Sequence, residues 1–422
     1  MSLHFRLARD TVGVMVIQAL SMGLGFAVSV VLARLLGVRE FGLYSLAMSV
    51  LGLLVVPATL GFPQLLVREI AAYRVKEEWG LIRGLLRFAQ CTSLLASLGI
   101  ALLGGLVLWG LSSRLSREAM QVLALAFAAL PFWALLELQE ASLRGFDQIL
   151  AGQWVKSAMR PLCFLIIIGI AWLLFREIRN ASLALGLHIL ATGIASAFAF
   201  YLLRGQLHRS APSSNASQNT TVWIRSSLHL TFLALLNLIP QHAGILMLGW
   251  MRSSEEVGLY KVALQTASLI PLGLMTVNIA IAPMLTQLYV SGNKNHLRQV
   301  LAIATSVASV MALPLILACI LRGGWILEHL FGNAYAGGAT ALAILSVGFF
   351  FNVATGVLWH LMIMTGYEQK TLVILSTSVV INLIINLIII PIWGAKGTAL
   401  AQTIALIINA LLTVYTAKWR WK

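Results

Sequence analysis

Apolar runs of about 20 residues recur along the whole 422-residue chain and are separated by short polar segments. A run of that length can cross the hydrocarbon core of a bilayer as one helix. A transmembrane barrel would instead show shorter segments of alternating apolar and polar residues. The pattern therefore predicts an all-α polytopic membrane protein. The charged fraction of only 10% agrees, since soluble proteins average about 25%.

We expect twelve transmembrane helices in two six-helix lobes. The first six spans cover 11–32, 43–66, 85–111, 119–141, 155–175 and 183–203, and the second six cover 228–250, 262–290, 300–321, 339–365, 372–392 and 398–417. The polar stretch 205–226 between the two sets has the composition of a cytoplasmic linker. These assignments predict an N-terminal lobe, 1–204, and a C-terminal lobe, 227–422.

A short motif is repeated near the start of each half. Glu40-Phe41-Gly42-Leu43-Tyr44 returns as Glu256-Val257-Gly258-Leu259-Tyr260, at an offset of 256 − 40 = 216 residues. A second echo relates Gly145-Phe146-Asp147-Gln148 to Gly366-Tyr367-Glu368-Gln369, at 366 − 145 = 221 residues. Two echoes in the same order predict an internal duplication. Because each half has an even number of spans, we expect a pseudo-two-fold axis along the membrane normal.

The formal charge of +15, from 29 Lys and Arg against 14 Asp and Glu, is explained by membrane topology. No aromatic-basic module accompanies it, so nucleic-acid binding is not expected. With the amino terminus inside, the outer loops hold 10 Lys and Arg and the inner segments hold 29 − 10 = 19. This bias predicts a plasma or inner membrane protein with both termini cytoplasmic. Aromatic belts are expected from the tryptophans, with Trp109, Trp172, Trp250 and Trp393 outside and Trp154, Trp223, Trp419 and Trp421 inside.

The sequence contains no phosphate-binding loop, no HExxH and no nucleophile elbow, which argues against ATP hydrolysis and zinc chemistry. The three cysteines all fall within predicted spans and are interpreted as buried thiols. We therefore expect no enzymatic activity, no catalytic residue, no metal and no cofactor.

Two carboxylates lie in the fourth predicted span. Glu137, Glu140 and Arg144 fall at i, i+3 and i+7, on one face of a helix. Ionised groups within a span are costly and usually face a bundle interior or a watery cavity. One interpretation is a cluster that binds a coupling cation or gates the cytoplasmic entrance. The other is that Glu140 pairs with Arg144 and reaches the headgroups.

Polar residues beside prolines mark further candidates for a transport pathway. Gln241 and His242 follow Pro240 in the seventh span, where they either bind substrate or form an interhelical bond at a kink. Asn278 lies between two prolines of the eighth span, and Gln64 lies beside a proline of the second. Broken helices at matching positions of two halves favour a pathway.

Four arginines, Arg34, Arg68, Arg144 and Arg160, lie near the ends of spans. A guanidinium can bind phosphate through two parallel hydrogen bonds, which would suit a pyrophosphate headgroup. The alternative for each is a simple topological or headgroup anchor.

Several short stretches match those of a known family. They are Leu32-Ala33-Arg34-Leu35-Leu36-Gly37 with the Glu40–Tyr44 motif, Arg144-Gly145-Phe146, and Asn382 and Asn386 followed by Pro391-Ile392-Trp393-Gly394-Ala395-Lys396-Gly397-Thr398-Ala399. With the twelve predicted spans, they make the chain resemble the polysaccharide flippases of the multidrug/oligosaccharidyl-lipid/polysaccharide exporter superfamily.

The resemblance implies a flippase that moves a lipid-linked (polyprenyl-pyrophosphate) oligosaccharide from the inner to the outer leaflet by alternating access, for cell-surface polysaccharide biosynthesis. It implies contact with membrane lipids, coupling to a Na+ or H+ gradient or to the membrane potential, and a polysaccharide polymerase or glycosyltransferases as candidate partners. Two alternatives stay open. One is a cation-coupled multidrug exporter of the same superfamily, with Glu137 or Glu140 binding the cation, and the other is a membrane-embedded envelope glycosyltransferase or ligase.

Overall fold

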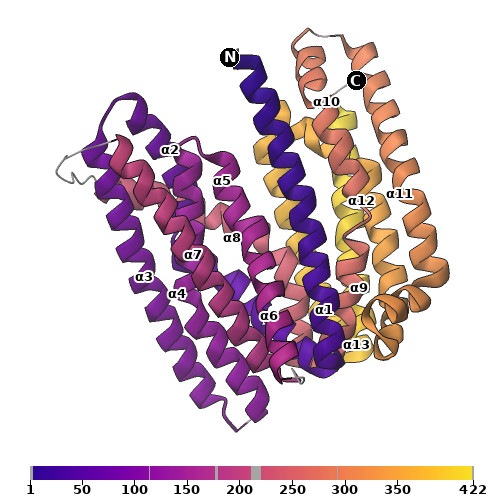
Figure 1. Ribbon diagram of the computed structural model, residues 1–422. Coiled ribbons are helices and arrows are strands. Elements are labelled where there is room, and N and C mark those ends of the chain that lie inside the picture. The colour runs from indigo at the N-terminus through magenta and orange to yellow at the C-terminus, as the bar shows by residue number, and fades with distance from the viewer. Residues whose placement is uncertain (1–2, 114, 176–178, 211–219, 292, 421–422) are drawn as a thin grey trace. The chain divides into compact units, whose positions relative to one another are not determined.

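The chain folds into helices, and no strand occurs among the described residues 3–113, 115–175, 179–210, 220–291 and 293–420 of the computed structural model (Figure 1). The helices form two compact units. Unit 1 comprises Met1–Leu36 and Ala47–Leu238, and unit 2 comprises Gly37–Leu46 and Ile239–Lys422. The prediction of an all-helical chain is confirmed for the described residues.

Helix α4 (Arg117–Gly145) lies at the centre of unit 1, in contact with α2, α3, α5 and α7 (Figure 1). It begins where the Ser116 hydroxyl accepts a hydrogen bond from the Ala119 amide at 3.2 Å. The other elements of this unit are α1 (Leu3–Thr59, except its middle), α2 (Phe62–Val75), α3 (Trp79–Gly110), α5 (Ile149–Trp154), the π-helical turn η1 (Val155–Met159), α6 (Arg160–Phe175), α7 (Ala181–Ser210) and most of α8 (Thr220–Met251).

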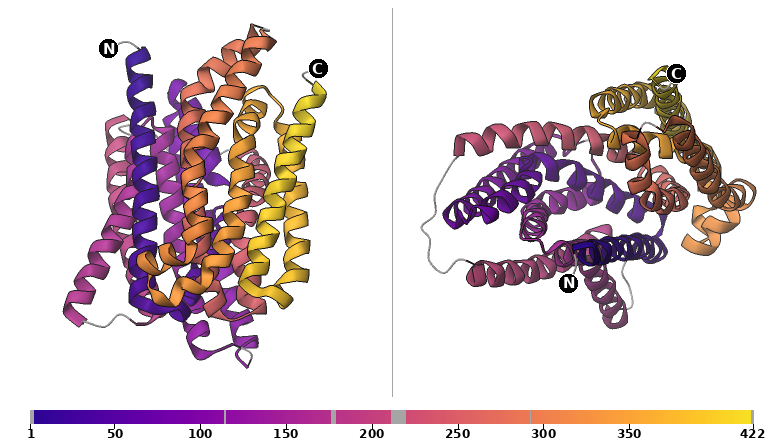
Figure 2. Two further views of the ribbon diagram at one scale, coloured as in Figure 1. Left: turned by 90° about the vertical axis from the view of Figure 1, so that its right-hand side faces the viewer. Right: turned by 90° about the horizontal axis from the view of Figure 1, so that it is seen from above.

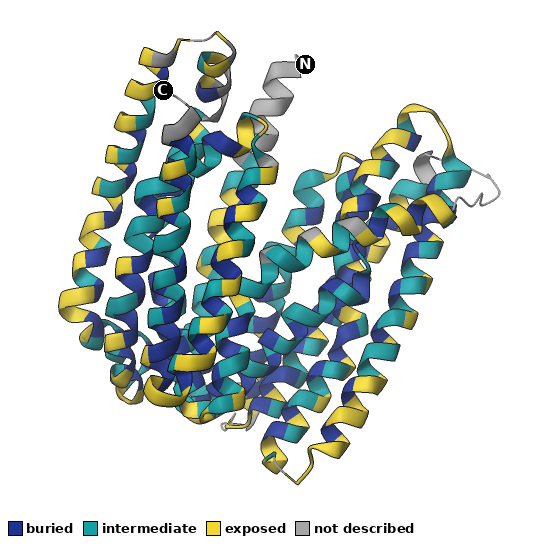
Figure 3. Ribbon diagram, turned by 180° about the vertical axis from the view of Figure 1, so that it is seen from behind, coloured by how far each residue is buried: buried dark blue, intermediate teal, exposed yellow. Residues whose placement is uncertain are grey.

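The side chains of α3 are distributed as expected for a helix in lipid. Its exposed face carries leucines, among them Leu95, Leu98 and Leu102, which are 71%, 50% and 72% exposed. Its buried face instead carries Ser93 and Ser97, both 0% exposed. In water this arrangement would be inverted, whereas in a bilayer small and polar residues mediate helix packing. The exposed positions are yellow in Figure 3.

Helix α12 (Ala339–Met364) has the corresponding central place in unit 2, where it contacts α9, α10, α11 and α13. Figure 2 shows the helices of this unit, orange to yellow, running side by side. Its remaining elements are α9 (Ser254–Ala267), α10 (Leu272–Val290), α11 (Lys294–Phe331), the 3-10 helix η2 (Asn333–Gly338) and α13 (Glu368–Arg420).

The two copies of the repeated motif contact each other within unit 2. A Cβ atom added to Gly42 would meet the carbonyl group of Ser254, and one added to Gly258 would meet the carbonyl group of Val38. These contacts are equivalent under the duplication, because 254 − 38 and 258 − 42 both equal 216. Such reciprocal contacts are what a local two-fold relation between the copies produces.

Among the described residues, nine helical stretches are long and apolar enough to cross a membrane, and α8 supplies a tenth if its two segments form one span. Two of the nine, Gly13–Thr59 in α1 and Gln369–Ala417 in α13, contain 47 and 49 residues. At 1.5 Å per residue each would measure about 70 Å, more than twice the hydrocarbon thickness. Both elements are interrupted by a non-helical glycine, Gly37 at φ 73° and Gly394 at φ 52°. Pairs of predicted spans therefore merge into single elements, which explains why fewer than twelve are seen.

Both ends of the predicted linker are helical, because α7 continues to Ser210 and α8 begins at Thr220. Residues 211–219 lie outside the described part of the chain. The lobe boundaries at 204 and 227 therefore stay a prediction.

Candidate functional site

The charged cluster predicted on the fourth span is present on α4. Glu140 is buried, with its side chain 6% exposed, and its Oε1 lies 2.9 Å from Nε of Arg144. This is the ion pair that one of the two sequence interpretations expected. Glu137, one turn earlier, lies on the same face but does not share this partner.

The partner of Glu137 is Lys156, a residue that the sequence analysis did not select. Its Nζ lies 2.7 Å from Oε2 of Glu137 and donates a hydrogen bond to it. Lys156 is part of η1, a single π-helical turn between α5 and α6, and such turns often occur at functional sites.

A glycine allows the π-helical segment to approach α4 closely. A Cβ atom at Gly152 would lie 2.9 Å from the carbonyl oxygen of Glu140 and 3.4 Å from Cβ of Leu143. A larger residue there would push α5 away from α4. The close approach brings Lys156 within reach of Glu137, so the backbone itself positions the second ion pair.

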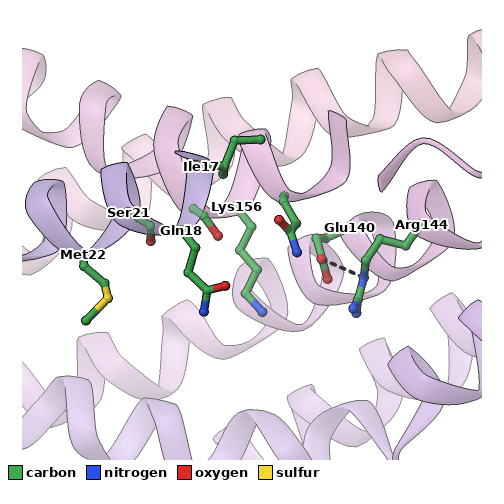
Figure 4. Close-up of a pocket in the computed structure, with 9 residues that line it drawn as sticks. Ile17, Gln18, Ser21, Met22, Glu140, Arg144 and Lys156 are labelled. Carbon is green, nitrogen blue, oxygen red and sulfur yellow. Dashed lines mark ion pairs between the residues drawn. The ribbon is translucent and has the colours of Figure 1, made fainter. Parts of the chain in front are cut away.

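These residues surround a cavity of about 290 Å³ within unit 1 (Figure 4). Helix α4 contributes Glu140 and Arg144, and the following segment contributes Gln153, Lys156 and Ser157. Helix α1 supplies the remaining lining residues, Ile17, Gln18, Ser21 and Met22. We call this space the polar cavity. It presents two cations, one carboxylate, two amides and two hydroxyl groups, a set that can bind a phosphate and the hydroxyls of a sugar.

Arg160 belongs to the same region through an aromatic stack. Its guanidinium carbon lies 5.3 Å from the ring centroid of Trp133 on α4, within the range of a cation–π interaction. The Trp133 ring lies 5.1 Å from that of His188, which stacks on Phe164 at 4.4 Å. Three helices, α4, α6 and α7, are thereby joined beside the cluster, with Arg160 at the start of α6.

A second unpredicted contact fixes the buried face of α4. Gln139, only 4% exposed, accepts a hydrogen bond at 2.9 Å from the hydroxyl of Ser196 on α7. In a membrane such interhelical hydrogen bonds contribute modestly to stability, but they fix the rotation of a helix. Glu140, the next residue on α4, contacts Arg144 and lines the polar cavity.

Three other predicted pathway residues of unit 1 do not line the polar cavity. Arg34 and Gln64 are exposed on α1 and α2. Arg68 is exposed as well, and its Nη2 pairs at 2.9 Å with the carboxylate of neighbouring Glu69. The structure thus brings together Glu137, Glu140, Arg144 and Arg160, while their roles remain predictions.

The three predicted pathway residues of the C-terminal half belong to unit 2. Gln241 is exposed and His242 is half-buried on α8. Asn278 is half-buried on α10, and its Oδ1 is buried without a hydrogen-bond partner among the described residues. A buried acceptor without a partner is unusual, so Asn278 is the strongest of these three candidates for contact with a ligand.

No group of three or more His, Cys, Asp or Glu side chains within the described ranges could hold a metal ion. The residues that the sequence analysis missed are those whose partner lies on another helix. For Lys156 the available signal was a lone lysine at the start of the fifth predicted span, 155–175.

Comparison with known proteins gives the family. The family model described as "Polysaccharide biosynthesis protein" matches residues 7–289, and the MatE model matches residues 230–388. A curated relative, "Probable flippase AglR" of Haloferax volcanii, is 26% identical over 172 residues, which cover 40% of this chain and 36% of the relative. The match thus spans little more than a third of that relative's length.

Solved structures share the fold at low sequence identity. An inward-facing multidrug resistance MATE family transporter of the MOP superfamily superimposes with a TM-score of 0.75 at 14% identity, covering 96% of this chain and 94% of its own. The lipid II flippase MurJ, in an inward closed conformation, gives 0.74 at 15% identity, covering 96% and 87%. A MOP superfamily transporter from Pyrococcus furiosus gives 0.64 at 14% identity, covering 98% and 95%. The fold is therefore that of this multi-span superfamily, and the family match over 7–289 shows that the chain belongs to the polysaccharide biosynthesis protein family.

Proposed function

We propose that this protein is a flippase that moves a lipid-linked (polyprenyl-pyrophosphate) oligosaccharide from the inner to the outer leaflet by alternating access. The observation that carries the proposal is the polar cavity, with Lys156 and Arg144 on its wall, in a member of a polysaccharide biosynthesis family. The likeness of part of the chain to a probable flippase supports it. The chain acts as a transporter for cell-surface polysaccharide biosynthesis and catalyses no reaction.

The size and the polar lining of the cavity allow it to bind only one part of such a substrate at a time. Its volume of about 290 Å³ is at the lower end of ligand cavities, which measure about 300–1,000 Å³. It can therefore hold a pyrophosphate or one sugar ring, whereas a whole oligosaccharide is too large. The amides of Gln18 and Gln153 and the hydroxyls of Ser21 and Ser157 supply partners for sugar hydroxyls.

The proposed topology has twelve crossings in a plasma or inner membrane, with both termini in the cytoplasm. It is supported by the long elements α1 and α13, each interrupted near its middle by a glycine, and by the positive charge of the predicted inner segments. The reciprocal contact of the two motif copies supports two lobes related by a pseudo-two-fold axis. Transport would draw on a Na+ or H+ gradient or the membrane potential, and a polymerase or glycosyltransferases would be its partners.

Export of small cationic drugs is the second candidate, favoured by the MatE match over residues 230–388. The geometry of the charged cluster argues against it. Glu140 is paired with Arg144 and Glu137 with Lys156, so both carboxylates of the cluster are already neutralised. A cationic drug would have to displace a positive side chain of the protein, whereas an anionic headgroup would meet two.

The experiment is a leaflet-exchange assay in proteoliposomes with a fluorescent polyprenyl-pyrophosphate oligosaccharide. Ser21→Trp, which fills the polar cavity, is expected to reduce the rate per folded molecule at least tenfold. Leu102→Trp places the same side chain on the lipid-exposed face of α3 and should leave the rate unchanged. If the unsubstituted protein moves no such lipid under any ion gradient or potential, the proposed function is wrong.

A further inference from the structure

Lys156 contacts Glu137 and also faces the polar cavity. Its ammonium group donates one hydrogen bond to Glu137 at 2.7 Å, and the same side chain lines the polar cavity. An ammonium group has three donors, and Glu137 is the one acceptor recorded for it among the described residues. With its side chain 34% exposed, Lys156 can offer further hydrogen bonds to a ligand while it keeps Glu137.

The backbone at Lys156 departs from regular α-helix and lies close to α4. The π-helical turn Val155–Met159 interrupts an otherwise α-helical span at Lys156, and Gly152 just before it permits close contact with α4. Figure 4 shows Lys156 directed toward the space beside Glu140 and Arg144, with Gln18 on the opposite side. Arg144 already uses Nε in its contact with Glu140, so its terminal nitrogens are the groups left for a ligand.

We propose that Lys156 is the principal phosphate-binding residue of the polar cavity and that Glu137 is its counter-ion when the cavity is empty. The inference rests on the proposed function, since it names the group that binds the substrate's pyrophosphate. Arg144 provides a second contact through its terminal nitrogens, because its Nε is used in the contact with Glu140. Glu137 lowers the affinity, because a ligand phosphate and the carboxylate compete for one ammonium.

A moderate affinity is what a carrier needs. The substrate must bind strongly enough to enter and weakly enough to leave on the other side, as in channels and their ion sites. Removing Lys156 and removing the charge of Glu137 should therefore change binding in opposite directions. A purely structural ion pair predicts that both substitutions change binding in the same direction, because loss of either partner breaks the same contact.

The test uses the purified full-length protein in detergent and farnesyl pyrophosphate as the probe, with farnesol and inorganic pyrophosphate as parallel ligands. We expect Lys156→Met to weaken probe binding at least tenfold and Glu137→Gln to strengthen it severalfold. Lys156→Arg should keep most of the affinity, since it keeps the charge. Lys76→Met, at an exposed lysine of the α2 terminus, is the matched control and should bind normally.

The outcomes separate this inference from the proposed function. Normal binding by Lys156→Met, or equal weakening by Lys156→Met and Glu137→Gln, would overturn the role of Lys156 even if the protein flips lipid. Opposite shifts with no leaflet exchange would support the phosphate site and refute only the transport. If Lys156→Met does not fold, the comparison of Lys156→Arg with Glu137→Gln decides, because a structural pair predicts no gain of affinity in the latter. Inorganic pyrophosphate that competes as well as the probe would assign the site to phosphate alone, with no contribution from the lipid.

Discussion

Replacing Gly42 with alanine should test the contact between the two motif copies in unit 2. The added Cβ would lie 2.7 Å from the carbonyl carbon of Ser254, with the carbonyl oxygen closer still, and 3.0 Å from the amide nitrogen of Gly258. All of these atoms belong to the backbone, so no change of side-chain rotamer can relieve the overlap. The two helical segments must separate.

The size of the effect follows from that geometry. Carbon atoms in contact lie about 3.5 Å apart, so the segments must move by at least about 3.5 − 2.7 = 0.8 Å. Overpacking of this kind costs about 1–3 kcal/mol. Alanine returns up to about 1 kcal/mol through its better helix propensity. Because the overlap is with backbone atoms, we take the upper end of the overpacking cost and expect Gly42→Ala to lower the free energy of unfolding by about 3 − 1 = 2 kcal/mol.

The matched control is Gly25→Ala, in the same helix α1. No atom lies within 4 Å of a Cβ added at Gly25, so this substitution tests helix propensity alone and should be neutral or slightly stabilising. The assay is the midpoint of thermal denaturation in detergent, followed by the monodisperse fraction after heating. Gly258→Ala should resemble Gly42→Ala, because its Cβ meets the equivalent carbonyl group of Val38. If Gly42→Ala and Gly25→Ala denature at the same temperature, the close contact does not exist in the folded protein.

Four further substitutions, at three positions, test contacts elsewhere in the chain. Arg252 donates hydrogen bonds to three carbonyl groups of α13 just before Gly394, so Arg252→Lys should lower the denaturation midpoint by a few degrees. Glu256 accepts a hydrogen bond from the Ala395 amide at 2.7 Å, so Glu256→Gln should lower the midpoint by less than Glu256→Ala. A midpoint unchanged in Arg252→Lys would show that the fork of hydrogen bonds is not needed. Gly152→Ala should push α5 from α4 and weaken farnesyl pyrophosphate binding severalfold at normal abundance, and binding equal to that of the unsubstituted protein would contradict the role given to this glycine.

The sequence predicted the features that depend on neighbouring residues. The length of the apolar runs predicted membrane helices, and the echo of Glu40–Tyr44 in Glu256–Tyr260 predicted an internal duplication. That the two copies contact each other in unit 2 was seen only in the structure. The span count differs because Gly37 and Gly394 turn the chain within continuous elements. Apolar length alone does not show whether two adjoining spans are separated by a loop or by one glycine.

Contacts between residues far apart in the chain could not be predicted from the sequence, and Trp223 is an example. The sequence placed it in an inner aromatic belt, but that interpretation is wrong. Trp223 is 0% exposed in the core of unit 1, where its indole nitrogen donates a hydrogen bond to the hydroxyl of Tyr73 at 3.1 Å. Trp109 and Trp250, 77% and 87% exposed, do have the exposure that a belt requires. Composition near a span end is the same in both cases, and only the partner 150 residues away distinguishes them.

For the same reason, the residues of the charged cluster were assigned from the sequence to separate hypotheses. The sequence analysis left Glu137 and Glu140 as a cation site or gate, or Glu140 as the partner of Arg144, and it left the arginines as phosphate ligands or simple anchors. It could not find the pair of Glu137 with Lys156, because spacing relates only residues on one helix. In the folded chain the carboxylates pair with Arg144 and Lys156, and the four formal charges sum to zero. Leaving a buried charge without its partner costs about 3–5 kcal/mol. A site that receives an anion inside a bilayer must therefore carry its own counter-ions while it is empty, so carboxylates beside the cations are what such a site requires.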